Sequence, residues 1–459
     1  MKNSTLLKYA VASNGDSMLY CYVTAFWLYY MTTVSGIPPA VAGTIAATGA
    51  VFQAIAGPFF AAWSDRFEHK LGKRRPFIIL ASAPLGLCAC LMFSELPLHG
   101  SLRIAVMFCL GAGFWVLFAA FFIPHLAWGA EIATGYDERT TIRTYSYVMY
   151  TTGFLIGSAL PTFAVERLEA SGFGAGGAWL CVTIILAGIS AGCILYTGLS
   201  IREQPSKRES ELSPFSLKVL AHDYGQVLKL RPLRLLIFAV IAYLIGNSMM
   251  IADRMYAFTF QMGFSGSFIS VLMLVFGLLG IVLAAPMMKF AKRFDKRTAL
   301  IACLSVCGCI MALLRFADIA NAHIAFILLL MLVYVVISTA YYQLMPATFY
   351  DICEVDEYEN KIKRAGTITS TMPMAQSLAS AVGMQLLGVR LQIGGFESGA
   401  AVQSSGAIAA IYDCFTLAPG VMFVIAAFFL YRFPITKQRF ETIRAELAAR
   451  RGEQTPPSV

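Results

Sequence analysis

The sequence predicts an all-α membrane protein with twelve transmembrane helices and both termini in the cytoplasm. Hydrophobic residues make up 58% of the 459-residue chain and charged residues only 13%, whereas charged residues make up about 25% of a usual soluble domain. Apolar runs long enough to cross about 30 Å of hydrocarbon as helices follow one another along the chain. The polar loops between them alternate between strongly and weakly basic. Together these observations exclude a soluble globular protein.

The first strongly basic loop separates the apolar runs at residues 37–62 and 77–93. It contains five cationic side chains: Arg66, Lys70, Lys73, Arg74 and Arg75. Short cationic loops stay on the cytoplasmic side of a membrane. This loop therefore orients the second and third spans, and the remaining topology can be counted from it.

The other loops follow the same alternation of charge. Of the 35 Lys and Arg residues, all but five lie in the termini, in loops on the predicted cytoplasmic side or at the span ends beside them; the exceptions are Arg103, Arg167, Arg254, Arg315 and Arg390. This asymmetry indicates an even number of spans with cytoplasmic termini. The net charge of +9 is spread over many loops, so we expect no nucleic-acid partner, which would require a basic face.

The apolar runs place the twelve spans and divide the chain into two six-helix halves. We expect the spans at residues 6–33, 38–63, 76–95, 101–130, 140–168, 178–200, 233–261, 267–288, 298–318, 322–350, 366–390 and 408–433. The predicted regions are an N-terminal half at 1–200, a cytoplasmic linker at 201–231, a C-terminal half at 232–433 and a cytoplasmic tail at 434–459. The linker is either an amphipathic surface helix beginning near Pro214 or a bare connection. A shift of 222 residues aligns Pro124 with Pro346 and Tyr136 with Tyr358, as expected of repeated halves in a transporter.

The sequence contains no pattern of catalytic residues. The 11 cysteines lie mostly in apolar spans, and Cys307 and Cys309 have no second pair at metal-binding spacing. There is no nucleotide-binding loop, no metal-spaced set of His and Cys, and no nucleophile with a nearby base. We therefore expect neither an enzyme nor a bound metal or cofactor, and we expect no cleavable signal segment.

Three polar stretches of the sequence form a pattern that is typical of a known protein family. They are Ser64-Asp65-Arg66 with Leu71 to Phe77, then Tyr136 to Arg139 after Pro124 and Trp128, and then Asp351 to Glu357 followed by Lys363 to Gly366. Together they resemble the loops of the major facilitator superfamily and, within it, of the glycoside–pentoside–hexuronide:cation symporters, the melibiose permease-like proteins. The resemblance covers nearly the whole chain and implies cation-coupled sugar symport. Plant-type sucrose carriers and vertebrate lysophospholipid carriers share parts of the pattern.

The chain departs from that family at the sites of its chemistry. Members carry two carboxylates one turn apart on helix two, where this chain has Gln53 and Gly57. A neutral amide supplies no negative charge to offset the dehydration of a cation, so we expect proton rather than sodium coupling. Phe122 stands at the position of the sugar-binding carboxylate of helix four, Ser146 at that of an Arg of helix five, and residues 366–389 contain no Lys.

The candidate substrate-binding residues are polar groups inside predicted spans, where ionisable side chains are costly and usually functional. Asp16 lies about 12 Å along the helix from Lys8 and matches a sugar-binding Asp of the family; a pair with a structural cation is the alternative. Arg254 is expected to meet Asp16 or an anionic substrate group, unless its span ends early. His125 is either a proton relay or a core residue, and Trp128 stacks on a sugar or lies in an interfacial belt. The full set is Asn14, Asp16, Tyr20, Gln53, His125, Trp128, Asp253, Arg254, Gln343 and Gln376.

The charged cytoplasmic stretches are predicted to form a gate. Acidic and basic residues lie close together in sequence at the ends of the predicted spans: Asp65, Arg66, Arg74, Arg75, Glu131, Arg139, Asp351, Glu354, Asp356 and Arg364. Ion pairs between the halves would stabilise an outward-open state and break on inward opening. A purely topological role is the alternative, because exposed pairs contribute only about 0–1 kcal/mol each.

We therefore predict a secondary transporter of the cell membrane, the inner membrane if the source is bacterial. It would couple a cation, H+ rather than Na+, to import of a sugar or glycoside by alternating access. The alternatives are a carrier of a lysophospholipid-like or other charged amphiphile, and a non-transporting membrane sensor. The expected partners are a small-molecule substrate and the lipid bilayer, with the protein acting as a monomer.

Overall fold

The computed structural model describes residues 3–67, 69–132, 136–203, 224–316, 324–360 and 365–451. The chain forms two compact units, and each is assembled from several segments. Unit 1 comprises Met1–Phe215, Met249–Gly277 and Ala381–Tyr412, and unit 2 comprises Ser216–Ser248, Leu278–Ser380 and Asp413–Val459. The predicted division into halves at residues 200 and 232 stays a prediction.

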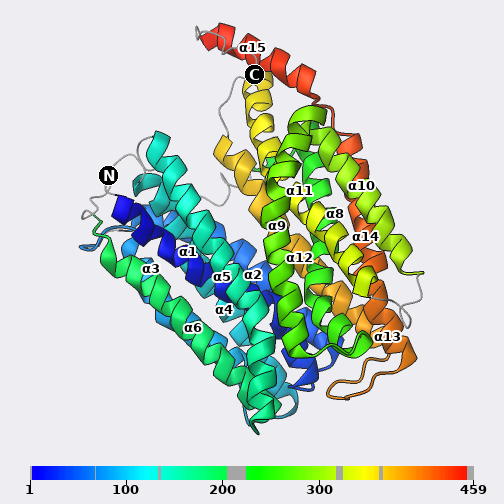
Figure 1. Ribbon diagram of the computed structural model, residues 1–459. Coiled ribbons are helices and arrows are strands. Elements are labelled where there is room, and N and C mark those ends of the chain that lie inside the picture. The colour runs from blue at the N-terminus through cyan, green and yellow to red at the C-terminus, as the bar shows by residue number, and fades with distance from the viewer. Residues whose placement is uncertain are drawn as a thin grey trace. The chain divides into compact units, whose positions relative to one another are not determined.

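Unit 1 contains the first six helices of the chain. These are α1 (Asn3–Thr33), α2 (Pro39–Arg66), α3 (Arg75–Met92), α4 (Gly100–Ile132), α5 (Tyr136–Ala170) and α6 (Ala175–Ser200). Pro39 and Pro76 stand in the first turns of α2 and α3, where a missing backbone N–H leaves no hydrogen bond unmade. Helix α1 packs along α5 and α6, α2 packs against α4, and α3 contacts both α4 and α6 (Figure 1).

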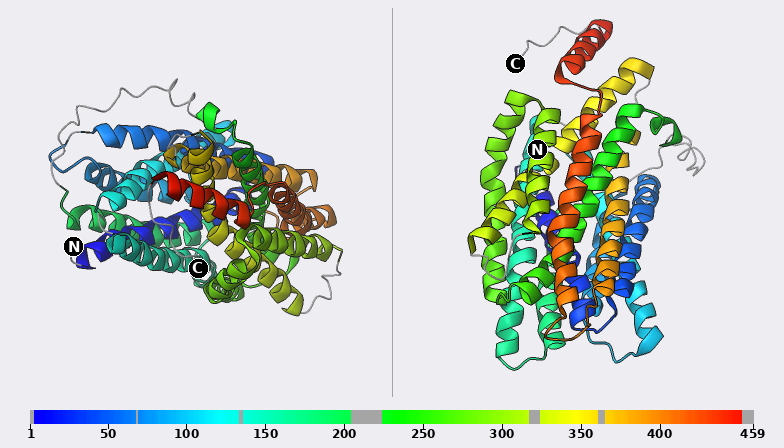
Figure 2. Two further views of the ribbon diagram at one scale, coloured as in Figure 1. Left: turned by 90° about the horizontal axis from the view of Figure 1, so that it is seen from above. Right: turned by 90° about the vertical axis from the view of Figure 1, so that its right-hand side faces the viewer.

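Unit 2 is built mainly from the later helices. The chain continues as α8 (Arg231–Tyr256), η1 (Ala257–Gln261), α9 (Gly266–Phe294), α10 (Lys296–Leu314), α11 (Ile324–Asn360), α12 (Ala365–Ile393), α13 (Ser405–Tyr412), η2 (Asp413–Leu417), α14 (Ala418–Tyr431) and α15 (Lys437–Arg451). Helices α8, α9 and α12 contribute residues to both units. Within unit 2, α10 packs against α11 and α14, and α15 lies across the end of α11 (Figure 2).

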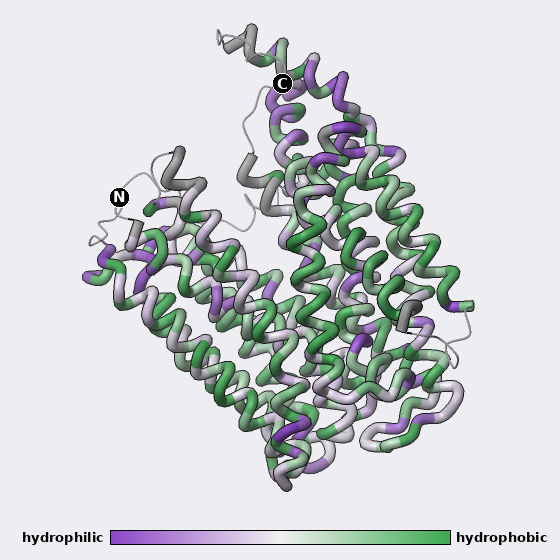
Figure 3. Tube along the Cα trace, in the orientation of Figure 1, coloured by the Kyte–Doolittle hydropathy of each residue, from purple (hydrophilic) through white to green (hydrophobic). Residues whose placement is uncertain are grey.

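Ten helical segments of the described chain are long and apolar enough to cross a membrane. Figure 3 shows apolar residues along most of their length and hydrophilic residues gathered at helix ends and in α15. The chain is therefore a multi-pass membrane protein. Helices α1 and α12, the predicted first and eleventh spans, do not belong to these ten, and both carry several polar side chains. The count of twelve spans and the orientation of the termini stay predictions.

The helices extend beyond several of the predicted spans. Asp351 to Glu357 were predicted in a loop, but α11 continues through them to Asn360, and α5 already begins at Tyr136. Hydropathy marks where an apolar run ends, whereas backbone hydrogen bonds allow a helix to continue through the polar residues that follow. The predicted cytoplasmic tail contains the helix α15, for which the sequence offered no signal. Most of the predicted linker helix lies outside the described residues.

Glycines allow α5 to approach α1 closely. A Cβ atom at Gly153 would collide with the carbonyl oxygen of Asn14, and one at Gly157 would collide with that of Met18. Small residues at such contacts are typical of membrane helices, because lipid supplies no hydrophobic force between them and close packing must hold them together. This contact fixes the backbone of α1 on both sides of Asp16.

We predict that Gly157→Ala destabilises unit 1 by about 1–3 kcal/mol, because the added methyl group meets the α1 backbone. The thermal unfolding temperature of the purified protein in detergent measures the effect. Gly188→Ala is the matched control, since a Cβ at this exposed position of α6 meets nothing within 4 Å. Equal unfolding temperatures of the two variants would contradict the close contact of α1 with α5.

Candidate functional site

Arg74 forms the centre of the first basic loop. Its side chain is only 5% exposed and donates from Nε and Nη2 to Oε1 of Glu131 at 3.2 and 3.0 Å. It also donates to Ser64 Oγ at 2.5 Å and forms an ion pair with Asp65. Lys73 lies 3.2 Å from the same carboxylate of Glu131. The buried guanidinium therefore joins the ends of α2 and α4 to the start of α3.

Glu203 holds the backbone of the same loop. Its carboxylate accepts hydrogen bonds from the amides of Lys73, Arg74 and Arg75, at 3.0–3.3 Å. These amides open α3, where the helix dipole favours a negative charge. Gly72 has φ +102°, and any Cβ there would meet Glu203. The positive φ angle and the lack of space for a Cβ atom are both reasons why this turn needs glycine.

The second basic loop repeats the arrangement in unit 2. Lys296 Nζ lies 2.5 Å from Asp351 Oδ2. Arg297 donates to the carbonyl oxygens of Leu430 and Tyr431 at the end of α14, at 3.1 and 2.6 Å. This matches a contact of unit 1, in which Arg75, 222 residues earlier in the chain, donates to the last carbonyls of α6 at 2.5 and 3.2 Å. The shared contacts support the predicted internal repeat.

The remaining predicted gate residues have mixed surroundings. Arg66 is exposed and donates to the Ala62 carbonyl oxygen at 2.9 Å. Asp356 is buried and accepts a hydrogen bond from Asn360 at 2.7 Å, while Glu354 is half-buried. The side chains of Arg139 and Arg364 lie outside the description. The described ion pairs of both basic loops join residues of one unit, so pairing between the halves stays a prediction.

Asp16 lies in the middle of α1 and is 4% exposed. Among the described residues its carboxylate has no hydrogen bond and no ion pair, and in particular none with Arg254. Asn14 donates to the Met149 carbonyl oxygen of α5 at 3.2 Å. The ring of Tyr20 packs against two aromatic rings of α4. The structure thus places three predicted residues along one helix whose position is fixed by α5.

His125 and Trp128 belong to the packing between α1 and α4. His125 is 3% exposed and stacks on Tyr9 with ring centroids 4.2 Å apart, and the Tyr9 hydroxyl donates to its backbone carbonyl at 2.8 Å. Trp128 is 2% exposed and meets the edge of the same ring. Neither predicted alternative for Trp128, a sugar platform or an interfacial belt, fits this burial. Helix packing, the core alternative for His125, agrees with the structure.

Asp253 and Arg254 follow one another near the end of α8. Asp253 is completely buried, and neither of its carboxylate oxygens has a hydrogen-bond partner among the described residues. Arg254 is half-buried and lies within electrostatic reach of the Cys21 thiol on α1. The π-helical turn η1 continues the span to Gln261. The helix therefore continues past both residues, and their depth relative to the membrane interface stays a prediction.

The predicted glutamines lie on three different helices. Gln53 of α2 is half-buried, as are Gln343 of α11 and Gln376 of α12. The side-chain oxygen of Gln343 is buried without a hydrogen-bond partner in the described part of the chain, and Gln376 lies beside Tyr341. Their amides offer both donors and acceptors, and their roles stay predictions.

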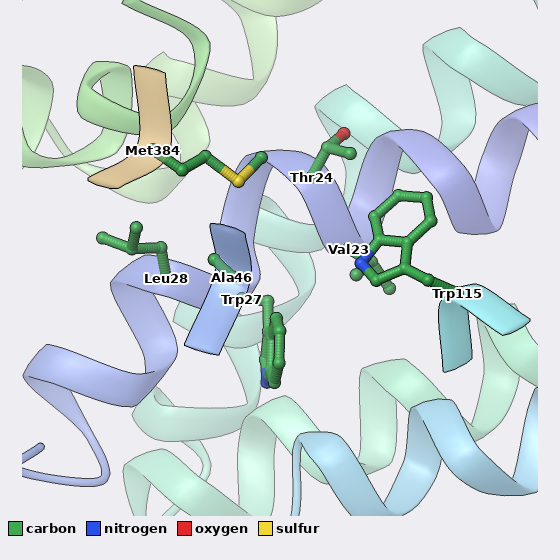
Figure 4. A pocket seen from close by; sticks show the side chains of 7 residues that line it. All are labelled: Val23, Thr24, Trp27, Leu28, Ala46, Trp115 and Met384. Atoms are coloured by element: carbon green, nitrogen blue, oxygen red, sulfur yellow. The ribbon is translucent and has the colours of Figure 1, made fainter. Parts of the chain in front are cut away.

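A small pocket within unit 1 was not predicted from the sequence. It lies between α1, α2, α4 and α12 (Figure 4), and its lining consists of Val23, Thr24, Trp27, Leu28, Ala46, Trp115 and Met384. Its space is about that of one water molecule. The signal in the sequence was Trp27 and Trp115, but an aromatic side chain in an apolar run is also typical of ordinary packing.

We predict that Arg74→Gln lowers the unfolding free energy by about 2 kcal/mol, because Glu131 and Asp65 lose their shared partner. Solvent around the two carboxylates keeps the loss below that of a fully buried pair. Thermal unfolding in detergent measures it. The control is Lys70→Gln, which removes an exposed charge from the same loop. An Arg74→Gln protein as stable as this control would show that the network only orients the loop.

Comparison with known proteins agrees with this architecture. The family described as MFS/sugar transport protein matches residues 8–437. The glucuronide carrier protein homolog of Escherichia coli K12 is 24% identical, with 98% of this chain and 96% of that protein aligned. The isoprimeverose transporter of Lactiplantibacillus pentosus is 23% identical, with 95% and 89% aligned.

A solved structure shows the same fold. The D-xylose-proton symporter superposes with a TM-score of 0.65 at 13% identity, covering 95% of this chain and 98% of that one. The family match confirms the predicted resemblance to the glycoside–pentoside–hexuronide:cation symporters of the major facilitator superfamily. The chain belongs to the MFS/sugar transport family, and it is a multi-pass transporter of the cell membrane rather than an enzyme.

Proposed function

We propose that this protein imports a sugar or glycoside together with a proton by alternating access, and that Asp16 binds the sugar. The relatives support the substrate class, since their names specify glucuronide and isoprimeverose. The observation that carries the proposal is the burial of Asp16 in α1 without a hydrogen-bond or ion-pair partner among the described residues. An ionised carboxylate in such a place needs donors.

Sugar hydroxyls are suitable donors for this carboxylate. A carboxylate offers about four acceptor positions and can hold two hydroxyl groups at once, and each hydrogen bond to a charged group contributes about 1.5–3 kcal/mol. Asn14 lies two residues away on another face of the helix, and its amide donates to the Met149 carbonyl oxygen of α5. A polar substrate with neighbouring hydroxyls matches the Asp16 carboxylate better than an apolar one.

The chemistry of α2 supports proton rather than sodium coupling. Between Pro39 and Ser64 this helix contains no carboxylate, and Gln53 and Gly57 occupy the positions where the family carries acids. A sodium site requires oxygen ligands that together offset the loss of hydration, and negative charge makes that easier. A proton needs only one titratable group. The protein is expected to act as a monomer in the bilayer.

The test is glycoside uptake into proteoliposomes under an imposed pH gradient. We predict that Asp16→Asn reduces uptake of the best glycoside more than about tenfold, because an amide loses the charge-assisted hydrogen bonds to hydroxyls. Glu397→Gln, which makes the same change at an exposed loop position, should transport like the wild type. Wild-type rates in Asp16→Asn would contradict the role of Asp16. Uptake of a lysophospholipid with no glycoside transported would favour the amphiphile carrier instead.

A further inference from the structure

Asp253 is a carboxylate that the proposed sugar site leaves without a role. It has no exposed surface, and both of its oxygens lack a hydrogen-bond partner among the described residues. It lies within the apolar span Arg231–Gln261. An ionised carboxylate buried in this way costs several kcal/mol unless it is paired. A structural Asp would be paired in the folded protein, so this arrangement indicates a side chain that carries a proton while it is buried.

Elimination among the buried acids leads to the same residue. The described part of the chain buries three carboxylates, Asp16, Asp253 and Asp356. Asp356 lies near the end of α11 and accepts a hydrogen bond from Asn360, and Asp16 is the proposed sugar ligand. The helix that carries the cation-binding acids of the family has none at those positions. Among the buried carboxylates of the described residues, Asp253 is therefore the one left to bind a proton.

Asp253 lies next to contacts between α8 and α1 whose opening would expose its carboxylate to water. Tyr256 lies one turn further along α8, on the same helix face. Its hydroxyl lies 2.6 Å from Thr32 Oγ1 and donates to the Leu28 carbonyl oxygen of α1 at 3.1 Å. The Tyr256 ring also packs edge-on against Tyr29. These contacts close α8 against the end of α1, next to Asp253.

The other titratable groups around Asp253 are few. Tyr256 interacts with it electrostatically. The neighbouring Arg254 points to a different face of the helix and interacts with Cys21 of α1. Directly after Tyr256 the backbone changes to the π-helical turn η1, an irregularity that is frequent at functional sites. A locally irregular helix can adjust here without breaking its regular part.

We propose that Asp253 binds the coupling proton, which the carboxylate takes up from water when the contact between Tyr256 and α1 opens and retains while that contact is closed. This rests on the proposed proton–glycoside symport and assigns its two ligands to different helices, the sugar to α1 and the proton to α8. In the step itself, one carboxylate oxygen gains a proton from water on one side of the membrane. The same oxygen releases that proton to water on the other side.

The experiment compares two kinds of transport by Asp253→Asn in proteoliposomes. The amide mimics the protonated acid, so exchange of labelled for unlabelled glycoside at equal pH should stay within about threefold of the wild type. Glycoside-driven proton flux and uptake under a pH gradient should fall more than about tenfold. The control is Glu359→Gln at an exposed position at the end of α11, which should leave both activities unchanged.

The outcomes separate this proposal from the proposed function. If Asp253→Asn moves as many protons per glycoside as the wild type does, Asp253 does not bind the coupling proton. Proton–glycoside symport itself would stand. If Asp253→Asn unfolds at the wild-type temperature but loses glycoside exchange together with proton flux, the proton assignment is overturned. Asp253 would then contact the substrate. A wild-type protein without any glycoside-driven proton flux would refute symport itself.

Infrared difference spectroscopy gives a readout that does not depend on transport. Raising the pH of the wild-type protein should remove a carbonyl band of a protonated carboxylic acid, and this band should be missing from Asp253→Asn and kept in Asp16→Asn. The same band in Asp253→Asn at wild-type intensity would show that Asp253 carries no titrating proton, whatever the transport assays give.

Discussion

The free-energy cost of a charge in hydrocarbon constrains this molecule more than any other interaction. It places the basic loops at helix ends, where Arg74 satisfies its buried guanidinium with Ser64, Asp65 and Glu131. The same constraint makes Asp16 and Asp253 exceptional, because the described residues give neither carboxylate a hydrogen bond. In the proposed function, a sugar completes Asp16 and a proton completes Asp253 during the transport cycle.

Most of the fold could be predicted from hydropathy and charge. Every predicted span has a helix in the structure, since a backbone in lipid must satisfy its own hydrogen bonds. The helix ends were less predictable, because a helix such as α11 continues past its apolar run into polar residues. The π-helical turns η1 and η2 and the polar helix α15 leave no signal in an average of hydropathy.

The candidate site was predictable only in part. Asp16 and Asp253 stood out in the sequence because an acid within an apolar run is costly. Their surroundings depend on contacts between residues far apart in the chain, such as Thr32 with Tyr256 and Tyr9 with His125, which no local pattern encodes. For the same reason the anchoring of the first basic loop by Glu203, about 130 residues away, could not be foreseen. Sequence reasoning therefore found the charges and missed the contacts around them.

In the proposed transport cycle, glycoside and proton move together without sodium. The most direct measurement is the pH outside weakly buffered proteoliposomes, followed with an electrode as a panel of glycosides is added in sodium-free medium. Proton–glycoside symport requires that at least one glycoside makes the outside more alkaline and that added sodium leaves the rate unchanged. Alkalinisation that requires sodium, or sodium-driven uptake with no change in pH, would contradict it and would show that a cation site exists without the acids of helix two.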